Sequence, residues 1–282
     1  MIQTICICGA GTMGSGITQL AAQAGFITIQ FDVNADMLTK SRNNIEANLD
    51  RLVSKGKLTS EEKQTCLQRI RFTSQLNDCK ADLVIEAIIE QAEAKINLFN
   101  ALAAINTPAT IFATNTSSLP VTALATSVPQ PERVAGMHFF NPAPLMKLVE
   151  VIRAAQTNDH TIGVLLDTAR RMGKTAVECT DAPGFIVNRV ARHYYLEAMR
   201  LVELGLADIN TVDKVMEATG FKMGPFALMD LIGIDINYNV SNIVWEALGK
   251  PKRLTPSPLQ KAKRDAGDLG RKTGKGFYEY GS

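Results

Sequence analysis

Short apolar runs alternate with longer amphipathic stretches through the first 180 residues of the chain. An apolar run at 2–8, an Ala-rich, helix-like stretch at 17–24 and a second apolar run at 26–31 predict a strand–helix–strand unit. Residues 35–75 predict one or two long polar helices around Lys55-Gly56-Lys57. Further strands are expected at 81–88, 110–115, 134–140, 147–152 and 175–179, with helices at 91–104 and 157–172. This alternation is typical of an α/β fold, a Rossmann-type, doubly wound, mainly parallel sheet with helices on both faces.

The pattern changes at Asp181-Ala182-Pro183-Gly184. Beyond this point helix-length segments follow one another, at 185–204, 209–218, 225–232, 235–248 and 259–266. Asp208 supplies helix-starting chemistry just before the second of them. We therefore expect two domains, a mixed α/β domain over residues 1–181 and an all-helical domain over residues 182–282.

The turn after the first predicted strand has the sequence Gly9-Ala10-Gly11-Thr12-Met13-Gly14. In a nucleotide-binding turn Gly9 permits the tight bend, Gly11 lets the backbone approach a pyrophosphate, and Gly14 lets helix and strand pack closely. The N–H groups at the start of the helix then bind phosphate oxygens. The second strand ends at Asp32, 18 residues beyond Gly14, where a carboxylate would accept hydrogen bonds from the adenosine ribose. An ordinary glycine-rich turn would not require this order of elements, so we predict a dinucleotide site at Gly9, Gly11, Thr12, Met13, Gly14 and Asp32.

Asp32 also bears on which dinucleotide binds. Its carboxylate would repel a ribose 2′-phosphate, and the next residues, Val33-Asn34-Ala35, offer no arginine to receive one. Lys40 and Arg42 lie further along and are expected on a solvated helix face. The predicted cofactor is NAD.

Composition narrows the class of protein. The 282 residues include 30 basic and 28 acidic side chains, which provides no electrostatic reason to expect a nucleic-acid partner. No secretory signal precedes the first strand, and no apolar stretch is long enough to span a bilayer. Cys6 and Cys8 fall on the same face of one strand, as buried thiols commonly do. We expect a cytoplasmic protein with neither a membrane nor a nucleic acid as its partner.

His138 is one of only three histidines and falls at the end of a predicted strand, where open α/β sheets bind their ligands. Glu150 interrupts an apolar, strand-like run, and a carboxylate buried there needs a partner. If the two strands bring these residues together, Glu150 would hold one imidazole nitrogen and raise the basicity of the other. The alternative is a core histidine with satisfied hydrogen bonds and a glutamate on a solvated face. Spacing alone leaves both interpretations open.

Two further polar positions are ambiguous from the sequence. Thr114-Asn115-Thr116-Ser117-Ser118 directly follows a strand, and could form a turn or helix cap or hydrogen-bond a substrate oxygen or the nicotinamide. Asn188 falls early in the first helix beyond the domain boundary, where two domains would form a cleft.

Four motifs together resemble the L-3-hydroxyacyl-CoA dehydrogenase family, and its short bacterial 3-hydroxybutyryl-CoA dehydrogenases above all. The motifs are Gly9-Ala10-Gly11-Thr12-Met13-Gly14, Asn115-Thr116-Ser117-Ser118, His138-Phe139-Phe140-Asn141-Pro142 and Pro183-Gly184-Phe185-Ile186-Val187-Asn188-Arg189. The resemblance extends to Met223-Gly224-Pro225 and to the tail Arg271-Lys272-Thr273-Gly274-Lys275-Gly276-Phe277-Tyr278, and so covers nearly the whole chain.

The resemblance implies an activity and a set of roles. The implied reaction is the NAD-dependent oxidation of an (S)-3-hydroxyacyl-CoA to a 3-oxoacyl-CoA, or its reverse, by a homodimer that joins through its helical domain and needs no metal. The resemblance puts the catalytic pair on His138 and Glu150 and the substrate-orienting groups on Ser117 and Asn188. The implied cofactor contacts are Asp32, Glu90, Lys95, Asn115, Ser117 and Asn141. Lys55 matches a CoA contact, with an exposed helix end as the alternative.

Three other functions stay open. Lys222 stands where many short-chain members carry an uncharged residue, which would suit a dicarboxylic substrate such as 3-hydroxyadipyl-CoA if its ammonium reached the acyl pocket. A dehydrogenase of L-gulonate type shares the nucleotide domain and a similar His–Glu pair. A non-catalytic, NAD-binding structural protein would need neither His138 nor Glu150.

Overall fold

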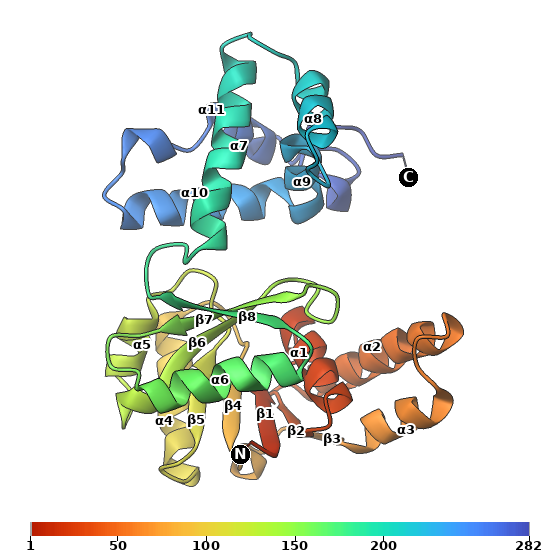
Figure 1. Ribbon diagram of the computed structural model, residues 1–282, viewed down its shortest axis with the longest axis vertical. Helices are drawn as coiled ribbons and strands as arrows, with labels where there is room; N and C mark the ends of the chain where they lie inside the picture. The colour runs from red at the N-terminus through yellow and green to blue at the C-terminus, as the bar shows by residue number, and fades with distance from the viewer. Residues whose placement is uncertain (1, 282) are drawn as a thin grey trace. The chain divides into compact units, whose positions relative to one another are not determined.

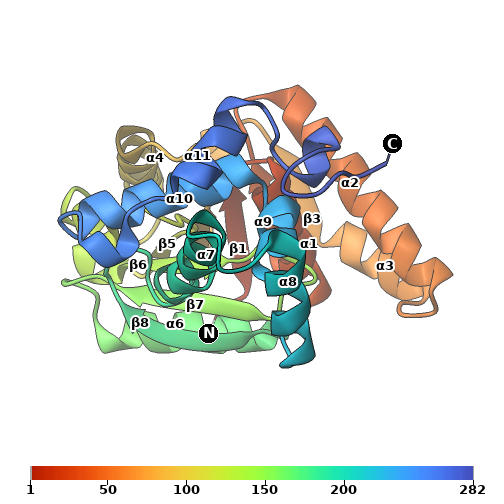
Figure 2. The same ribbon diagram turned by 90° about the horizontal axis from the view of Figure 1, so that it is seen from above.

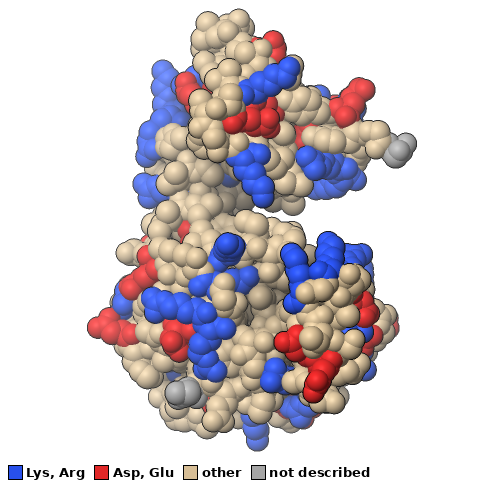
Figure 3. Space-filling view, turned by 45° about the vertical axis from the view of Figure 1, so that its right-hand side comes forward, with Lys and Arg blue, Asp and Glu red and all other residues tan. Residues whose placement is uncertain are grey.

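The computed structural model describes residues 2–281. The chain divides into two compact units, Met1–Asp181 and Ala182–Ser282, which are described separately. Figure 3 shows that basic and acidic side chains both occur on the displayed face of each unit. Within residues 2–281, no helix has the length and apolar character needed to cross a membrane.

Over the described residues, the first unit contains an eight-stranded sheet in the order β3-β2-β1-β4-β5-β6-β7-β8. The strands are β1 (Thr4–Cys8), β2 (Ile27–Phe31), β3 (Ile70–Thr73), β4 (Leu83–Glu86), β5 (Ile111–Thr114), β6 (Val134–Phe139), β7 (Leu148–Arg153) and β8 (Thr175–Thr180). All neighbours pair in parallel except β6 and β7, which are antiparallel. The predicted α/β fold with a mainly parallel sheet is confirmed.

Helices cover both faces of this sheet (Figure 1). They are α1 (Thr12–Gln23), α2 (Ala35–Ser54), α3 (Ser60–Gln68), α4 (Ala92–Ile105), α5 (Val121–Thr126) and α6 (Asp159–Arg171). On one face Ile17 of α1 and Leu165 of α6 join Ile5 and Ile7 of β1 in the main core. On the other face Phe99 of α4 packs against Phe112 of β5, with ring centroids 5.5 Å apart. Successive side chains of a strand point to opposite faces, so the continuous buried runs of the central strands β1, β4 and β5 place apolar side chains on both faces.

Two elements differ from the pattern-based expectation. The prediction that residues 35–75 are helical is wrong at its end, because Ile70–Thr73 form β3, which pairs in parallel with β2. Residues Val121–Thr126 form α5, for which no helix was expected. Both elements are short, and an edge strand of four residues depends on a partner distant in the chain rather than on a local period.

The second unit is helical, as predicted, with its core formed around Met199, Phe226 and Met229. Its helices are α7 (Val187–Glu203), α8 (Ile209–Ala218), α9 (Pro225–Ile232), α10 (Ile234–Ala247) and α11 (Pro258–Asp265). Asp208 caps α8 by accepting a hydrogen bond from the N–H of Thr211 at 2.8 Å. Figure 2 shows α11 beside α10, with which it is in contact.

The glycine-rich tail is held by two buried aspartates. Asp230 accepts hydrogen bonds from the backbone N–H groups of Phe277 and Tyr278 and from the Tyr280 hydroxyl, each at 2.9 Å. Asp213 accepts a hydrogen bond from the Tyr278 hydroxyl at 2.9 Å. A Cβ atom at Gly276 would lie 2.2 Å from the Asp230 carboxylate, so only glycine fits there. The residues of the tail motif are therefore explained by packing and hydrogen bonding within the helical unit.

Candidate active site

The three glycines of the turn between β1 and α1 differ in what surrounds them. Gly9 has a φ of +112°, and a Cβ there would lie 2.4 Å from the Ala87 carbonyl oxygen. A Cβ at Gly14 would lie 2.0 Å from the carbonyl oxygen of Gly9. A Cβ at Gly11 would meet nothing within 4 Å. Folding thus requires Gly9 and Gly14, whereas Gly11 borders open space that a ligand can enter.

The start of α1 suits an anion. Its N-cap residue is Gly11, which has no side chain to cap the first N–H groups, and its first turn contains no acidic residue. Thr12 and Met13 begin the helix at this point. The N–H groups and the positive end of the helix dipole therefore face the open space beside Gly11.

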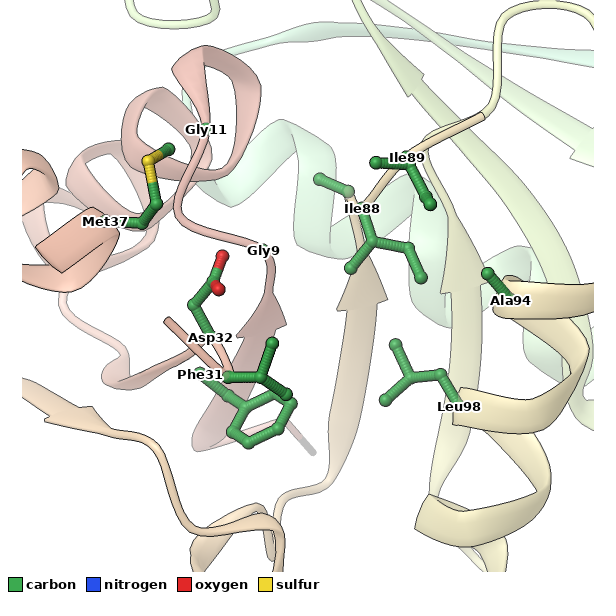
Figure 4. A pocket seen from close by; sticks show the side chains of 11 residues that line it. Gly9, Gly11, Phe31, Asp32, Met37, Ile88, Ile89, Ala94 and Leu98 are labelled. Carbon is green, nitrogen blue, oxygen red and sulfur yellow. The ribbon is translucent and has the colours of Figure 1, made fainter. Parts of the chain in front are cut away.

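A pocket of about 630 Å³ lies beside this turn (Figure 4). Its walls are largely apolar and include Phe31, Val33, Met37, Ile88 and Leu98. Asp32 lines it at the end of β2, where its carboxylate accepts hydrogen bonds from the N–H groups of Ala10 at 2.8 Å and Asn34 at 2.9 Å. An apolar pocket lined by one fixed carboxylate fits an adenosine group whose ribose has free hydroxyls.

The two basic residues after Asp32 do not line this pocket. Lys40 and Arg42 are exposed on α2. The Arg42 guanidinium lies over the ring of Phe72 in β3, 4.7 Å from its centroid.

The structure brings His138 and Glu150 together. They are direct partners in the antiparallel pairing of β6 with β7, and both side chains are buried. His138 Nδ1 lies 2.8 Å from Glu150 Oε2. Phe140 packs against the imidazole, with ring centroids 4.5 Å apart. A carboxylate bonded at Nδ1 fixes the ring's orientation and tautomer, so Nε2 is the atom that can exchange a proton with a ligand.

The loop after β5 connects to the same region. The backbone N–H of Asn115 donates to the Glu86 carbonyl at 2.8 Å, and its side-chain Oδ1 accepts from the N–H of Phe139 at 2.9 Å. Asn115 thereby ties the ends of β4, β5 and β6 together next to His138. Ser117 donates its N–H to Glu90 Oε1 at 3.1 Å, so the loop is anchored through Glu90 as well.

Glu90 and Lys95 are neighbours, with Nζ of Lys95 3.1 Å from Oε2 of Glu90. Burial alone would raise the pKa of Glu90, but the Lys95 ammonium and the hydrogen bonds from Thr116 and Ser117 outweigh it and hold that pKa below its usual value. Lys95 is buried, and its ammonium is engaged by carboxylates. Glu90 is the more exposed of the two and so the one able to meet a ligand.

Asn141 lies in the loop between β6 and β7, which is fixed by hydrogen bonds from Lys174. Asn141 and Thr12 both line a small cleft of about 210 Å³ between α1, α2 and this loop. The buried Lys174 donates from Nζ to the carbonyl oxygens of Ala143 and Met146, each at 2.7 Å, and burial lowers the pKa of Lys174. The loop that carries Asn141 is therefore fixed by Lys174, and it lines a cleft together with residues of α1 and α2.

Two other predicted site residues, Lys55 and Asn188, are found at the end of α2 and the start of α7. Lys55 is the exposed C-cap residue of α2 and lines neither pocket. Asn188 belongs to the helical unit, at the start of α7, where its carbonyl oxygen accepts a hydrogen bond from Arg192.

Glu86 and Lys174 were not predicted as site residues. Glu86 could have been noticed as an acid that ends an apolar strand, like Asp32. Lys174 follows Gly173 at the end of α6, which by itself indicates nothing. Among residues 2–281, no three His, Cys, Asp or Glu side chains form a group able to hold a metal ion.

Known proteins match the chain over nearly its whole length. Residues 4–182 match the profile described as 3-hydroxyacyl-CoA dehydrogenase, NAD binding domain, and residues 184–280 match 3-hydroxyacyl-CoA dehydrogenase, C-terminal domain. A Deinococcus radiodurans protein named "Probable 3-hydroxybutyryl-CoA dehydrogenase" is 44% identical over 276 residues, covering 97% of this chain and 99% of that protein.

Two further relatives extend the comparison. The 3-hydroxyadipyl-CoA dehydrogenase of Escherichia coli is 43% identical over 281 residues, which are 99% of this chain but 59% of that longer protein. The crystal structure of (S)-3-hydroxybutyryl-CoA dehydrogenase from Ralstonia eutropha aligns with a TM-score of 0.96 at 36% identity and covers 100% of both chains.

Proposed function

The chain belongs to the NAD-binding 3-hydroxyacyl-CoA dehydrogenase family, and from that premise we propose that it interconverts (S)-3-hydroxybutyryl-CoA and acetoacetyl-CoA. The predicted family and the predicted NAD cofactor are both confirmed by the profile match. The substrate is proposed from the names of the relatives and from the chemistry of the site. The observation that carries the proposal is the buried His138–Glu150 pair at the carboxyl edge of the sheet that also bears the glycine turn.

Two parts of the first unit fit NAD. The open N-terminus of α1 beside Gly11 would hold the pyrophosphate, and the apolar pocket with Asp32 would hold the adenosine. When bound, NAD accepts the hydride that leaves C3 of the hydroxyacyl group. His138 takes the hydroxyl proton on Nε2 as the C3–O bond becomes a carbonyl. Glu150, bonded to Nδ1, orients the ring and stabilises the imidazolium that forms. In the reverse direction the same imidazolium returns the proton to the forming alkoxide.

Further roles follow from the family resemblance. We propose that Ser117 and Asn188 hydrogen-bond the substrate oxygens, and that Lys55 contacts the CoA moiety. Glu90, Asn115 and Asn141 would contact the cofactor, and Lys95 would act on it through Glu90.

A spectrophotometric assay of NADH oxidation with acetoacetyl-CoA tests the function. His138→Ala should lower kcat by about 10²- to 10⁴-fold, the range for a general acid–base group. Its NADH affinity, measured by titration without substrate, should stay within about twofold of wild type. Normal turnover by this variant would overturn the proposed role. Turnover of L-gulonate in place of acetoacetyl-CoA would favour a dehydrogenase of L-gulonate type. Turnover of neither compound would favour a non-catalytic, NAD-binding structural protein.

A dicarboxylic acyl-CoA is the second candidate substrate. The name of the E. coli relative and the exposed ammonium of Lys222 between α8 and α9 favour it. Lys222→Ala should then reduce kcat/KM for 3-hydroxyadipyl-CoA more than for 3-hydroxybutyryl-CoA. Equal effects on the two substrates would remove this candidate.

We also propose that the protein is a cytoplasmic homodimer that joins through its helical unit. Large apolar side chains are exposed on this unit, among them Leu204, Leu206, Phe221, Leu231, Ile236 and Ile243. A dimer interface would cover such a surface. All five cysteines are free, which suits a reducing compartment. Analytical ultracentrifugation and cell fractionation test the two statements, and a monomeric mass at micromolar concentration would contradict the first.

A further inference from the structure

We propose that Glu86, Lys95 and Glu90 form a charge triad that sets the relative affinity of this protein for NAD⁺ and NADH. The inference deepens the proposed function and rests on it for the nature of the reaction. It concerns cofactor binding, however, and can be measured without any substrate.

Lys95 and Glu86 form a fully buried ion pair. The Lys95 side chain is 1% exposed and the Glu86 side chain 0%, and Nζ lies 2.6 Å from Glu86 Oε1. Glu86 also accepts hydrogen bonds from the N–H of Ile88 and the hydroxyl of Thr114, each at 2.7 Å. Both of its oxygens act as acceptors, as those of an ionised carboxylate do.

Stability alone does not explain such a pair. Burying two charges has a large desolvation cost, and well-packed apolar residues of similar volume are often as stable or more so. Glu86 ends β4 and Thr114 ends β5, so the pair lies at the carboxyl edge of the sheet, where an open α/β sheet binds its ligand. Its position therefore points to a role in ligand binding.

The third member connects the pair to the ligand-binding edge. Lys95 Nζ also lies 3.1 Å from Glu90 Oε2, and the Glu90 side chain is 39% exposed. The other oxygen of Glu90 accepts hydrogen bonds from the hydroxyls of Thr116 and Ser118 and from the N–H of Ser117. Glu90 thus faces outward and holds the loop, while Lys95 and Glu86 lie beneath it. Two carboxylates and one ammonium leave a net charge of −1.

The strand order places this charge toward the nicotinamide end. The adenosine pocket lies at Asp32, beyond the end of β2, and a dinucleotide crosses the carboxyl edge of such a sheet from there over β1 to β4 and β5. The nicotinamide ring is positively charged when oxidised and neutral when reduced. A fixed charge of −1 near the ring therefore stabilises bound NAD⁺ relative to bound NADH.

The test compares dissociation constants of NAD⁺ and NADH, measured by calorimetric titration without substrate. Glu86→Gln brings the triad to zero net charge and should raise the ratio Kd(NAD⁺)/Kd(NADH) by on the order of fivefold. Lys95→Met removes the positive charge and should lower the ratio. The double variant E86Q/K95M keeps Glu90 alone, with the original charge of −1, and should restore the wild-type ratio. If the triad had a purely structural role, the ratio Kd(NAD⁺)/Kd(NADH) would instead shift in the same direction in both single variants.

Two further variants complete the experiment. Glu90→Gln, at a more exposed position, should raise the ratio as Glu86→Gln does even if the buried variants fold poorly. Arg133→Met is the matched control, because Arg133 is a buried cation that donates to the carbonyl oxygens of Thr107 and Thr110 before β5. It should reduce thermal stability and leave the ratio unchanged.

The outcomes separate the inference from the proposed function. Shifts of equal sign in E86Q and K95M, or an unrestored ratio in the double variant, would overturn the inference. Opposite shifts in a protein that fails to reduce acetoacetyl-CoA would support the inference and reject the proposed function.

Discussion

Alanine at Gly11 or at Gly14 should separate cofactor binding from folding. Gly11 has φ −70° and ψ −172°, an extended conformation that alanine adopts without strain, and its Cβ would meet nothing within 4 Å. At Gly14 the new Cβ would lie 2.0 Å from the Gly9 carbonyl oxygen, well inside the 3.4 Å at which ordinary van der Waals contact begins. Because the contacted atoms belong to the backbone carbonyl of Gly9, α1 must move away from the turn by roughly 1 Å.

The magnitudes differ accordingly. Gly11→Ala loses a favourable N-cap residue, at about 0.5–1 kcal/mol, but restricts the unfolded chain, which returns about 0.4–1 kcal/mol. Its unfolding free energy should therefore stay within about 0.5 kcal/mol of wild type. Its methyl group occupies the space for the pyrophosphate, and loss of one charge-assisted hydrogen bond of about 1.5–3 kcal/mol weakens NAD binding by about 10- to 100-fold. Gly14→Ala should lose about 1–3 kcal/mol of stability from overpacking, and NAD affinity as well.

Urea unfolding without cofactor and calorimetric titration with NAD measure the two effects. A second readout is the stabilisation of wild type by added NAD, about 2.7 kcal/mol at 100 times Kd, which should fall to about 0.4–1.4 kcal/mol in Gly11→Ala at the same concentration. Wild-type NAD affinity in Gly11→Ala would show that no phosphate approaches this residue. Wild-type stability in Gly14→Ala would refute the close contact between α1 and the turn.

Three other perturbations have expected outcomes. Glu150→Gln keeps a hydrogen bond to Nδ1 but removes the negative charge, so kcat should fall by about 10- to 10²-fold, less than in His138→Ala, and an unchanged kcat would contradict the pairing. The pKa of Glu90 is held below its usual 4.5. Its stabilising interactions are therefore complete above about pH 4.5 and are lost as the pH falls through the lowered pKa. The difference in unfolding free energy between wild type and Glu90→Gln should shrink on acidification, and a constant difference would be inconsistent with the ion pair. Tyr280→Phe removes a bond to the buried Asp230 and should lower the unfolding free energy by about 1–2 kcal/mol at pH 7. Burial and Asp230 raise the pKa of Tyr280 from 10 to about 12, so this stabilisation is present below pH 10 and should disappear as the pH approaches 12, which denaturation at several pH values measures.

Much of the fold could be predicted from local features of the chain. A few neighbouring residues specify each of three features: the glycine turn, the acid directly after β2, and the Asp208 cap. Their conformations follow from backbone sterics and short-range hydrogen bonds. The strand β3 was missed because its four residues carry no period of their own and exist as a strand only through pairing with β2.

Less of the candidate site could be predicted from local features of the sequence. Glu150 lies twelve positions beyond His138, a spacing compatible with either a paired or an unpaired arrangement, and the antiparallel pairing of β6 with β7 selects the first. Glu86 was not predicted as a site residue: its place at the end of an apolar strand is a weak signal, and its contacts with Thr114 and Lys95 appear only in the structure.

The sequence by itself determined the types of most elements, though not of β3 or α5, their order along the chain and the family. These depend on hydrophobic period, on caps and on glycines whose effects are local. Only the tertiary structure decided which strands are neighbours, that β7 runs against β6, and that Lys95 is buried between two carboxylates. The physical reason is that strand pairing and ion-pair burial are settled by the packing of residues distant in the chain, which no local pattern records.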